Sequence, residues 1–299
     1  MDALLPFLVP ALAGVWVGVL SGLLGIGGGT VMVPIFRLCF GMSAIVSTAT
    51  SLFAIIPTSI SGAITHLRKK TCLPALGLAA GLGGALTSPV GVWLAHRSPD
   101  WLVMLAAALI IGYSAYNMFK KAAKMPKGGR RAKASGAAAA GGTRPSYVGG
   151  MNDRGAAGDG CAASSRPADS RPRLSLKQLG IGVLIGLAAG LASGYVGVGG
   201  GFIMVPFMLT FLGIDMRHAS GTSLIAVMIL AVPGVVEQAL LGSIDYVAGL
   251  SLAVGSIPGA VIGARLVSVV PERALRFVFG SFLLVAAALL AVSDLGILG

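Results

Sequence analysis

The segment Ser21-Gly-Leu-Leu-Gly-Ile-Gly-Gly-Gly-Thr-Val-Met-Val-Pro34 places three consecutive glycines inside apolar sequence, and the same pattern returns in the second half of the chain. The second copy is Ser193-Gly-Tyr-Val-Gly-Val-Gly-Gly-Gly-Phe-Ile-Met-Val-Pro206, and nine of the fourteen positions are identical. An internal repeat of this kind determines the architecture of a chain. Glycine and proline interruptions at matching places in two hydrophobic halves also indicate a transporter binding site. We call residues 25–29 and 197–201 the first and the second glycine break.

The composition is that of a membrane protein. Hydrophobic residues make up 56% of the 299 residues, charged residues only 11%, and the mean hydropathy is +0.90. These values exclude an ordinary soluble domain. A helix needs roughly 20 apolar residues to cross about 30 Å of hydrocarbon. The apolar segments that reach or approach this length are Leu4–Leu24, Ala44–Leu67, Leu73–Ala95, Trp101–Phe119, Leu179–Val198, Ser220–Leu241, Tyr246–Val269 and Ala274–Val292. We therefore predict an all-α polytopic membrane protein.

The repeat continues far beyond the glycine breaks at the constant offset that joins Ser21 to Ser193. Thr50-Ser51-Leu52 matches Thr222-Ser223-Leu224, and Pro99-Asp100 matches Pro271-Glu272. We predict two pseudo-symmetric membrane repeats, residues 1–119 and 179–299. Each has a long span, a glycine break, a short half-helix and three further spans, which gives eight full spans in total. The half-helices are expected at Thr30–Phe40 and Phe202–Leu212, with Pro34 and Pro206 in their first turns, where proline is tolerated.

Residues 120–178 form the predicted linker between the repeats. They hold thirteen Lys and Arg against three Asp, which accounts for +10 of the net charge of +12. Their Gly, Ala, Ser, Pro and Arg content predicts disorder. Their positive charge predicts a cytoplasmic location, where anionic lipid is a candidate partner. Because the charge is confined to this loop, we expect no nucleic-acid partner.

The relative orientation of the repeats has two alternatives. If the half-helices only dip into the membrane and out again, each repeat crosses four times and the repeats are parallel. If they add a crossing, the number is odd and the repeats are inverted. Inversion with both termini outside leaves only Arg37 and Arg97 outside, whereas the parallel arrangement leaves six arginines there. The Lys and Arg bias therefore favours inversion.

The glycine breaks are candidates for the substrate site. Three glycines weaken a helix, and a broken backbone persists in a bilayer only against protein or a wet cavity. The unpaired N–H groups that open the next half-helix suit an anion. The alternative is close helix packing, because serine and glycine recur at every fourth position. The candidate residues are Ser21, Gly25, Gly27, Gly28, Gly29, Ser193, Gly197, Gly199, Gly200 and Gly201.

Repeated hydroxyls and one carboxylate are further candidates. Thr50 and Ser51 match Thr222 and Ser223, and their hydroxyls either donate to an anion or bond to nearby backbone. Glu237 lies within an apolar span and is a candidate for proton coupling. Alternatively, it lies near the membrane surface, because Gly242 follows closely.

The sequence favours a transport function over an enzymatic one. The three cysteines, Cys39, Cys72 and Cys161, share no metal-binding spacing. The glycine breaks lack the Lys-Ser/Thr of a phosphate-binding loop. The sequence shows no pairing of a nucleophilic residue with a general base. We expect neither a catalytic site, nor a metal ion, nor a cofactor.

Two copies of Ser-Gly-x-x-Gly-x-Gly-Gly-Gly-(x)3-Val-Pro, each followed about twenty residues later by Thr-Ser-Leu, resemble the TauE/SafE sulfite exporter family, also called the toluene sulfonate uptake permeases. The resemblance implies a bacterial inner-membrane carrier of sulfite, organosulfonates or other small organic anions. It implicates the glycine breaks, Ser21, Ser193, Thr50, Ser51, Thr222 and Ser223 in substrate binding. We therefore expect a secondary transporter that exports such oxyanions by alternating access. An anion channel and a carrier of other organic anions remain alternatives, and the oligomeric state is not predicted.

Overall fold

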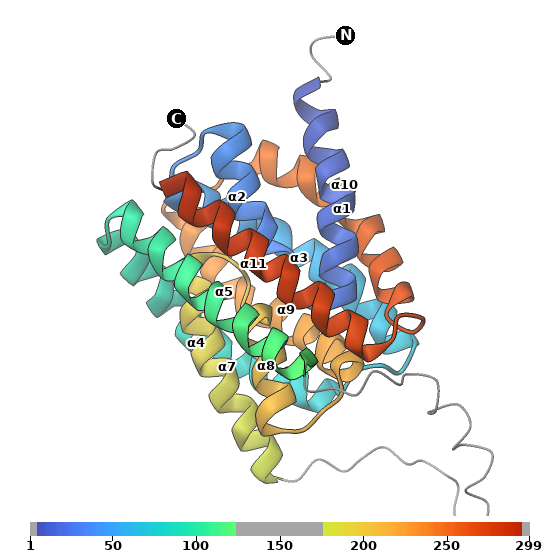
Figure 1. Ribbon diagram of the computed structural model, residues 1–299. Helices are drawn as coiled ribbons and strands as arrows, with labels where there is room; N and C mark the ends of the chain where they lie inside the picture. Colours follow the sequence, from blue (N-terminus) through green and yellow to red (C-terminus); the bar gives the residue numbers. More distant parts are fainter. Residues whose placement is uncertain (1–4, 124–175, 295–299) are drawn as a thin grey trace, which may run out of the picture. The chain divides into compact units, whose positions relative to one another are not determined.

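The computed structural model describes residues 5–123 and 176–294, which form ten α-helices and no strand. The helices of the first half are α1 (Leu5–Leu24), α2 (Gly29–Phe40), α3 (Ala44–Arg68), α4 (Pro74–Arg97) and α5 (Asp100–Ala123). Those of the second half are α7 (Leu176–Val196), α8 (Gly201–Phe211), α9 (Met216–Leu240), α10 (Tyr246–Leu266) and α11 (Glu272–Asp294) (Figure 1). The all-α prediction is confirmed for these residues. Apart from its two edges, the predicted linker lies outside the described residues.

Six of the described helices are long and apolar enough to cross a membrane. They are Ala44–Arg68, Pro74–Arg97, Asp100–Lys120, Leu176–Val196, Met216–Leu240 and Tyr246–Leu266. The two other expected spans correspond to α1, whose Pro10–Leu24 part is a shorter apolar helix, and to α11. The structure therefore supports a multi-pass membrane protein, but it does not establish eight full spans.

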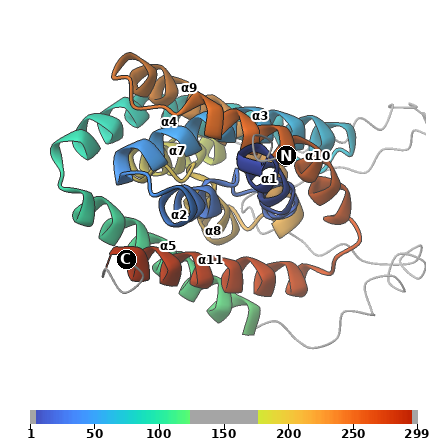
Figure 2. The same cartoon turned by 90° about the horizontal axis from the view of Figure 1, so that it is seen from above.

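The two halves pack mainly against each other. Helix α1 lies along α10, α4 lies along α7 and α9, α3 contacts α9 and α10, and α5 contacts α11. Seen from above, the short helices α2 and α8 lie between two layers (Figure 2). One layer is formed by α5 and α11, and the other contains α3, α4, α9 and α10. Each short helix is thereby covered by helices of both halves.

Glycines bring the closest helix pairs together. A Cβ atom at Gly18 of α1 would overlap the backbone of Ser256 in α10, and one at Gly190 of α7 would overlap the backbone of Gly84 in α4. Small residues spaced four apart produce such close helix contacts in membranes. Gly22 and Gly194, which belong to the two copies of the repeated motif, lie equally close to the backbones of α10 and α4, respectively. Close helix packing therefore explains these four glycines, none of which is among the candidate site residues.

Contacts between helix ends show the relative directions of α3, α5, α9 and α11. Asp100, which begins α5, accepts a hydrogen bond from the Ala44 amide at the start of α3, at 3.2 Å. Glu272, which begins α11, accepts one from the Met216 amide at the start of α9, at 3.4 Å. His66 near the end of α3 lies beside Gly221 near the start of α9. Helix α3 is therefore antiparallel to α9, and α5 is antiparallel to α11.

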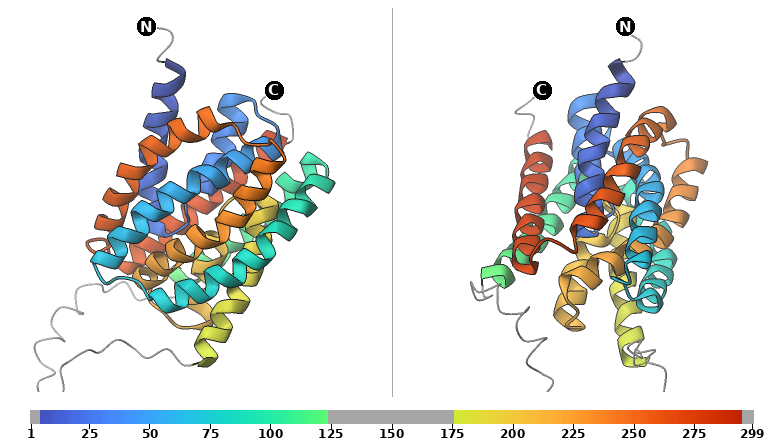
Figure 3. Two further views of the ribbon diagram at one scale, coloured as in Figure 1. Left: turned by 180° about the vertical axis from the view of Figure 1, so that it is seen from behind. Right: turned by 90° about the vertical axis from the view of Figure 1, so that its right-hand side faces the viewer.

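These directions define two ends of the bundle. We call the end where α1 begins and α11 ends the terminal end, and the end where α5 ends and α7 begins the linker end (Figure 3). Helix α1 enters from the terminal end, and α2 returns to the start of α3 at that same end. The pair α7 and α8 makes the corresponding hairpin from the linker end. Each half therefore has three through-going helices after a hairpin that turns back.

This hairpin differs from both sequence-based alternatives. In both alternatives the first long helix crosses the membrane by itself. They differ only in whether the half-helix adds a further crossing. The structure instead turns the half-helix back alongside the long helix, because the glycine break reverses the chain. The structure therefore combines short helices that turn back with counterpart helices, α3 and α9 and likewise α5 and α11, that run antiparallel.

Candidate functional site

Both glycine breaks turn in the left-handed region of backbone conformation. Their φ angles are 74°, 84° and 90° at Gly25, Gly27 and Gly28. The second break has φ angles of 71°, 74° and 24° at Gly197, Gly199 and Gly200. Residues with a side chain rarely adopt such angles, so the turn itself requires glycine. Close packing alone does not explain these positions.

The two breaks meet in the interior of the protein. A Cβ atom at Gly29 would overlap the carbonyl group of Val198, and one at Gly201 would overlap the carbonyl oxygens of Gly25 and Ile26. The breaks share their apolar neighbours as well, because Ile55 and Val227 each lie beside both Gly27 and Gly199.

The breaks lie halfway along the through-going helices. Ile55 and Val227 are each the twelfth of the 25 residues of α3 and α9, and they occupy equivalent positions of the two halves. All ten residues of the two breaks are buried. The backbones of the two breaks are in direct contact, and the apolar side chains of Ile55 and Val227 pack against both of them.

Each short helix begins at a break with no side-chain cap. Gly28 is the N-cap of α2 and Gly200 is the N-cap of α8, and neither N-terminus receives a side-chain hydrogen bond. The first N–H groups of a helix lack intrahelical partners and concentrate the positive end of the helix dipole. The protein therefore places two positive helix ends side by side in a buried region.

Two expectations about the short helices were wrong: they begin one residue earlier, at Gly29 and Gly201, and their prolines do not lie in the first turn. Pro34 and Pro206 are the sixth residues of α2 and α8, so they lie in the second turn and not in the first. A proline at this position leaves the carbonyl group four residues earlier without its usual backbone donor. Those carbonyl groups belong to Thr30 and Phe202.

Ser51 and Ser223 connect each half to the break of the other half. The Ser51 hydroxyl donates to the carbonyl oxygens of Gly197 at 2.5 Å and Thr48 at 2.8 Å. The Ser223 hydroxyl donates to those of Gly25 at 2.6 Å and Ser220 at 2.9 Å. Both hydroxyls therefore satisfy carbonyl groups that the broken helices leave unpaired. The backbone-bonding alternative applies here, although the backbone belongs to the opposite half.

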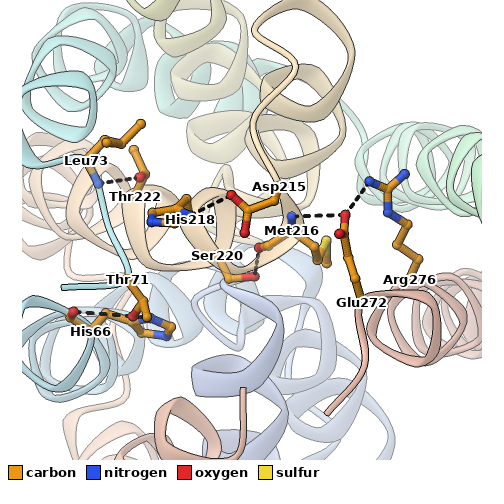
Figure 4. Close-up of polar contacts among 10 residues, drawn as sticks. All are labelled: His66, Thr71, Leu73, Asp215, Met216, His218, Ser220, Thr222, Glu272 and Arg276. Carbon is orange, nitrogen blue, oxygen red and sulfur yellow. Dashed lines mark hydrogen bonds and ion pairs between the residues drawn. The ribbon is translucent and has the colours of Figure 1, made fainter. Parts of the chain in front are cut away.

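Thr50 and Thr222 form hydrogen bonds with the residues that precede α10 and α4. The Thr50 hydroxyl accepts a hydrogen bond from the Asp245 amide before α10 at 3.0 Å. The Thr222 hydroxyl accepts one from the Leu73 amide before α4 at 2.9 Å (Figure 4). These two contacts are equivalent under the constant offset between the halves. Both threonines lie away from the glycine breaks, at the ends of α10 and α4.

A second group of hydroxyls is buried without any hydrogen-bond partner. Ser21 and Ser193, at equivalent positions in the two halves, are 1% and 0% exposed, and neither hydroxyl oxygen has a partner. Thr30 and Ser59 share this property at 0% exposure. Three of the four lie at the first break. A Cβ atom added to Gly28 would lie 3.5 Å from Ser21 Cβ, and one added to Gly27 would lie 3.5 Å from Ser59 Oγ. Thr30 is the second residue of α2.

The sequence analysis missed Thr30 and Ser59 as candidate site residues. Their equivalents in the second half are Phe202 and Ala231, so the search for repeated polar residues passed over them. A comparison of polar against apolar residues at equivalent positions would have found both. The two breaks are thus unequal, and the first is the more polar.

Glu237 lies in the last turn of α9, at the terminal end of the bundle. Its carboxylate oxygen Oε2 is buried without a partner although the residue is partly exposed. The neighbouring Gln238 is fully buried, and its Oε1 lies 2.9 Å from Nε2 of His96 on α4. Glu237 is therefore remote from the glycine breaks. Within residues 5–123 and 176–294, no cluster of three His, Cys, Asp or Glu side chains could hold a metal ion.

The family model "Sulfite exporter TauE/SafE" matches residues 10–290. The chain belongs to this family. The TauE/SafE match spans both halves and both glycine breaks, and family membership together with the six apolar helices supports a transmembrane transporter.

The curated relatives include two that are similar along most of their length and one that matches over a part of its length. The probable membrane transporter protein YdhB of Bacillus subtilis is 25% identical, over 87% of this chain and 89% of that protein. YjnA of the same organism, with the same description, is 23% identical over 92% and 96%. The probable membrane transporter protein MamO of Paramagnetospirillum magneticum is 37% identical over 38% of this chain and 20% of its own length. No solved structure gave a significant match.

Buried hydroxyls that bond to a carbonyl group and buried hydroxyls without a partner should differ in their effect on stability. Replacement Ser223→Ala leaves a buried Gly25 carbonyl group without its donor, which we expect to lower the free energy of unfolding by about 1–3 kcal/mol. Ser193→Ala removes an equally buried hydroxyl that has no partner, and we expect little loss. Thermal unfolding of the detergent-purified variants, followed by size-exclusion chromatography, measures the difference. Equal destabilisation by both replacements would contradict the assignment.

Proposed function

We propose that this protein is a secondary transporter that exports small sulfur-containing oxyanions, sulfite or an organosulfonate, by alternating access. The observation that carries the proposal is the meeting of two uncapped, buried helix N-termini with partnerless hydroxyls around them. Each N-terminus has about +0.5 of an elementary charge. Two together supply about +1, which favours a small oxyanion, and the hydroxyls supply donors that fix its orientation. Family membership favours sulfur-containing anions and export.

We propose that the halves are inverted repeats. All five helices of the first half have counterparts at nearly the same offset in the second, and the counterparts α3 and α9 run antiparallel, as do α5 and α11. The cross-half contacts exchange in the same way, since α1 on α10 corresponds to α7 on α4. In inverted-repeat transporters the substrate site lies near the membrane midplane, where the repeats meet. Here that place is the contact between the glycine breaks.

The inverted arrangement suggests how the two sides open in turn. Ser51 and Ser223 are each the eighth residue of α3 and α9, so the Ser51–Gly197 contact lies toward the terminal end. The Ser223–Gly25 contact lies toward the linker end. Both contacts are formed together, which corresponds to a closed state. In our proposal, breaking one contact while keeping the other exposes the breaks to one side of the membrane at a time. The energy would come from an ion gradient or from the anion gradient itself.

We propose that the linker end faces the bacterial cytoplasm and that the chain lies in the inner membrane. The Lys and Arg residues near the linker end are Arg68, Lys69, Lys70, Lys120, Lys177, Arg217, Arg265, Arg273 and Arg276. Those near the terminal end are Arg37 and Arg97. The positive-inside rule places the more basic end in the cytoplasm. The predicted basic linker would then be cytoplasmic as well.

The native cysteines test this orientation. Cys39 is exposed near the terminal end, and Cys72 is buried, which raises the pKa of its thiol and lowers its reactivity. We expect a membrane-impermeant maleimide to label Cys39 in intact spheroplasts of a Cys161→Ser variant. In the matched control, which retains Cys161 and has Cys39→Ser, labelling should require permeabilised membranes. The reverse pattern would place the linker end outside.

Flux measurements on proteoliposomes test the proposed site. We expect Ser21→Ala, Thr30→Val and Ser59→Ala each to reduce sulfite counterflow by about tenfold or more, because each removes a hydrogen bond to a charged group. Ser88→Ala is the matched control, since this hydroxyl on α4 is equally buried and partnerless but lies beside Gly234 of α9. A panel of sulfite, thiosulfate, sulfoacetate, sulfate and small carboxylates identifies the substrate.

Two results would overturn parts of this proposal. Wild-type flux in all three folded site variants would exclude the first glycine break as the binding site. Unitary currents far above the turnover of a carrier would make the protein an anion channel.

We propose Glu237 as the site that couples transport to protons. A carboxylate oxygen buried without a partner inside a membrane helix is expensive unless it has a function. Since Glu237 lies at the terminal end and not at the breaks, coupling would act through movement of α9 against α4.

Replacement Glu237→Gln tests the coupling role. We expect the variant to transport sulfite down its own gradient, while an imposed pH gradient no longer changes the rate. Initial rates in proteoliposomes with and without the pH gradient measure this effect. If the variant responds to the gradient as the wild type does, Glu237 is not the coupling group.

A further inference from the structure

A basic hollow opens between the ends of α3 and α10 at the linker end. Its volume is about 360 Å³, and Arg68, Lys69 and Arg265 line it together with the hydroxyl residues Ser61 and Thr65. Ser61, Thr65 and Arg68 follow one another at intervals of four and three residues, so they lie on one face of α3. No acidic residue is among the residues that line the hollow.

Internal hydrogen bonds fix the shape of the hollow. The Lys69 ammonium group donates to the carbonyl oxygen of Arg265 at 3.0 Å and to the Ser268 hydroxyl at 3.2 Å. The Ser61 hydroxyl donates to the carbonyl oxygen of Ile257 at 2.8 Å, which joins α3 to α10 about two turns deeper. The two helix ends are thereby held together, although three cationic side chains gather there. Such a group of like charges is stabilised when an anion lies among them.

The walls of the hollow are apolar on the membrane side. Ile64 lines it and is 46% exposed. The adjoining large apolar residues that are exposed on this flank of α3 and α10 are Ile60, Leu67, Ile257, Ile262 and Leu266. Exposed isoleucines and leucines on a membrane helix are suited to contact lipid acyl chains. The hollow therefore combines a cationic floor near the membrane surface with an apolar rim facing the hydrocarbon.

We propose that this hollow binds the phosphate headgroup of an anionic phospholipid in the leaflet at the linker end. Arg68, Arg265 and the remaining N–H of Lys69 would donate to the phosphodiester, and the Ser61 and Thr65 hydroxyl oxygens would accept from hydroxyl groups of the headgroup. The apolar flank would hold the acyl chains. Anionic lipids are attracted to basic clusters at this level of the membrane, by about 1 kcal/mol for each Lys or Arg. The site is separate from the glycine breaks, because α3 and α10 alone, with Lys69, form it. The bound lipid would connect α3 of one half to α10 of the other and so stabilise their contact.

Lipid binding to the purified full-length protein tests the proposal. The probe is dioctanoyl-phosphatidylglycerol, titrated in detergent and followed by native mass spectrometry, with dioctanoyl-phosphatidylcholine and inorganic phosphate as separate arms. We expect Arg68→Gln with Arg265→Gln to weaken phosphatidylglycerol binding by about 30-fold, since two cations contribute. The matched control Lys70→Gln with Lys120→Gln removes the same charge from the same end, outside the hollow, and should change the affinity by less than about threefold.

A second variant separates the shape of the hollow from its charge. Ile64→Trp fills the space and keeps all three cations, and we expect it to weaken phosphatidylglycerol binding by about fivefold or more. Equal losses in the two charge variants would indicate diffuse attraction and overturn the proposal. The same conclusion would follow if Ile64→Trp left binding unchanged. Inorganic phosphate binding as tightly as phosphatidylglycerol would make the hollow an anion site without a lipid.

Discussion

The fold depends on satisfying the backbone of two helices that are broken inside an apolar bundle. Each break frees carbonyl and N–H groups that water does not reach, and an unpaired buried group is unfavourable by several kcal/mol in hydrocarbon. One carbonyl group of each break is satisfied from the opposite half, where the Ser223 hydroxyl donates to Gly25 and the Ser51 hydroxyl donates to Gly197. The halves therefore complete each other and do not stand as separate bodies. This exchange explains why the hydroxyls that repeat in the sequence lie where the halves meet.

The N–H groups at the breaks differ from the carbonyl groups in their hydrogen bonding. The serines that bind carbonyl groups leave the starts of α2 and α8 without side-chain caps, and Ser21, Thr30, Ser59 and Ser193 stay without partners nearby. Buried polar groups are usually paired, so these partnerless hydroxyls require an explanation, and our proposal explains them by a bound ligand. The side chains of Ile55 and Val227 pack against both breaks. In our proposal, the positive helix ends and the hydroxyl donors favour a small anion.

Sequence reasoning predicted the all-helical plan and the positions of the two glycine breaks. The constant offset between the repeats located every helix of the second half from the first, and the positive φ angles explain the glycines that packing alone did not require. It misassigned the start of both short helices by one residue, because a run of glycines has no local signal for the first helical position. It also grouped Thr50 with Ser51, whereas only Ser51 reaches a break and Thr50 holds the start of α10. Neighbouring residues of a helix point in different directions, so adjacency in sequence did not imply a shared role.

The amino-acid sequence by itself determined the membrane environment, the duplication and the positions of the two breaks, because hydropathy and glycine content act locally along the chain. Only the tertiary structure decided that α1 and α2 form a hairpin that turns back, and that the breaks meet midway along α3 and α9. It also decided which hydroxyls are satisfied and which are free, as the difference between Ser223 and Ser193 illustrates. These features depend on contacts between residues far apart in the chain, such as the one between Ser51 and Gly197, which are separated by 146 residues. The pairing of distant backbone groups is set by packing of the whole bundle, and no local pattern encodes it.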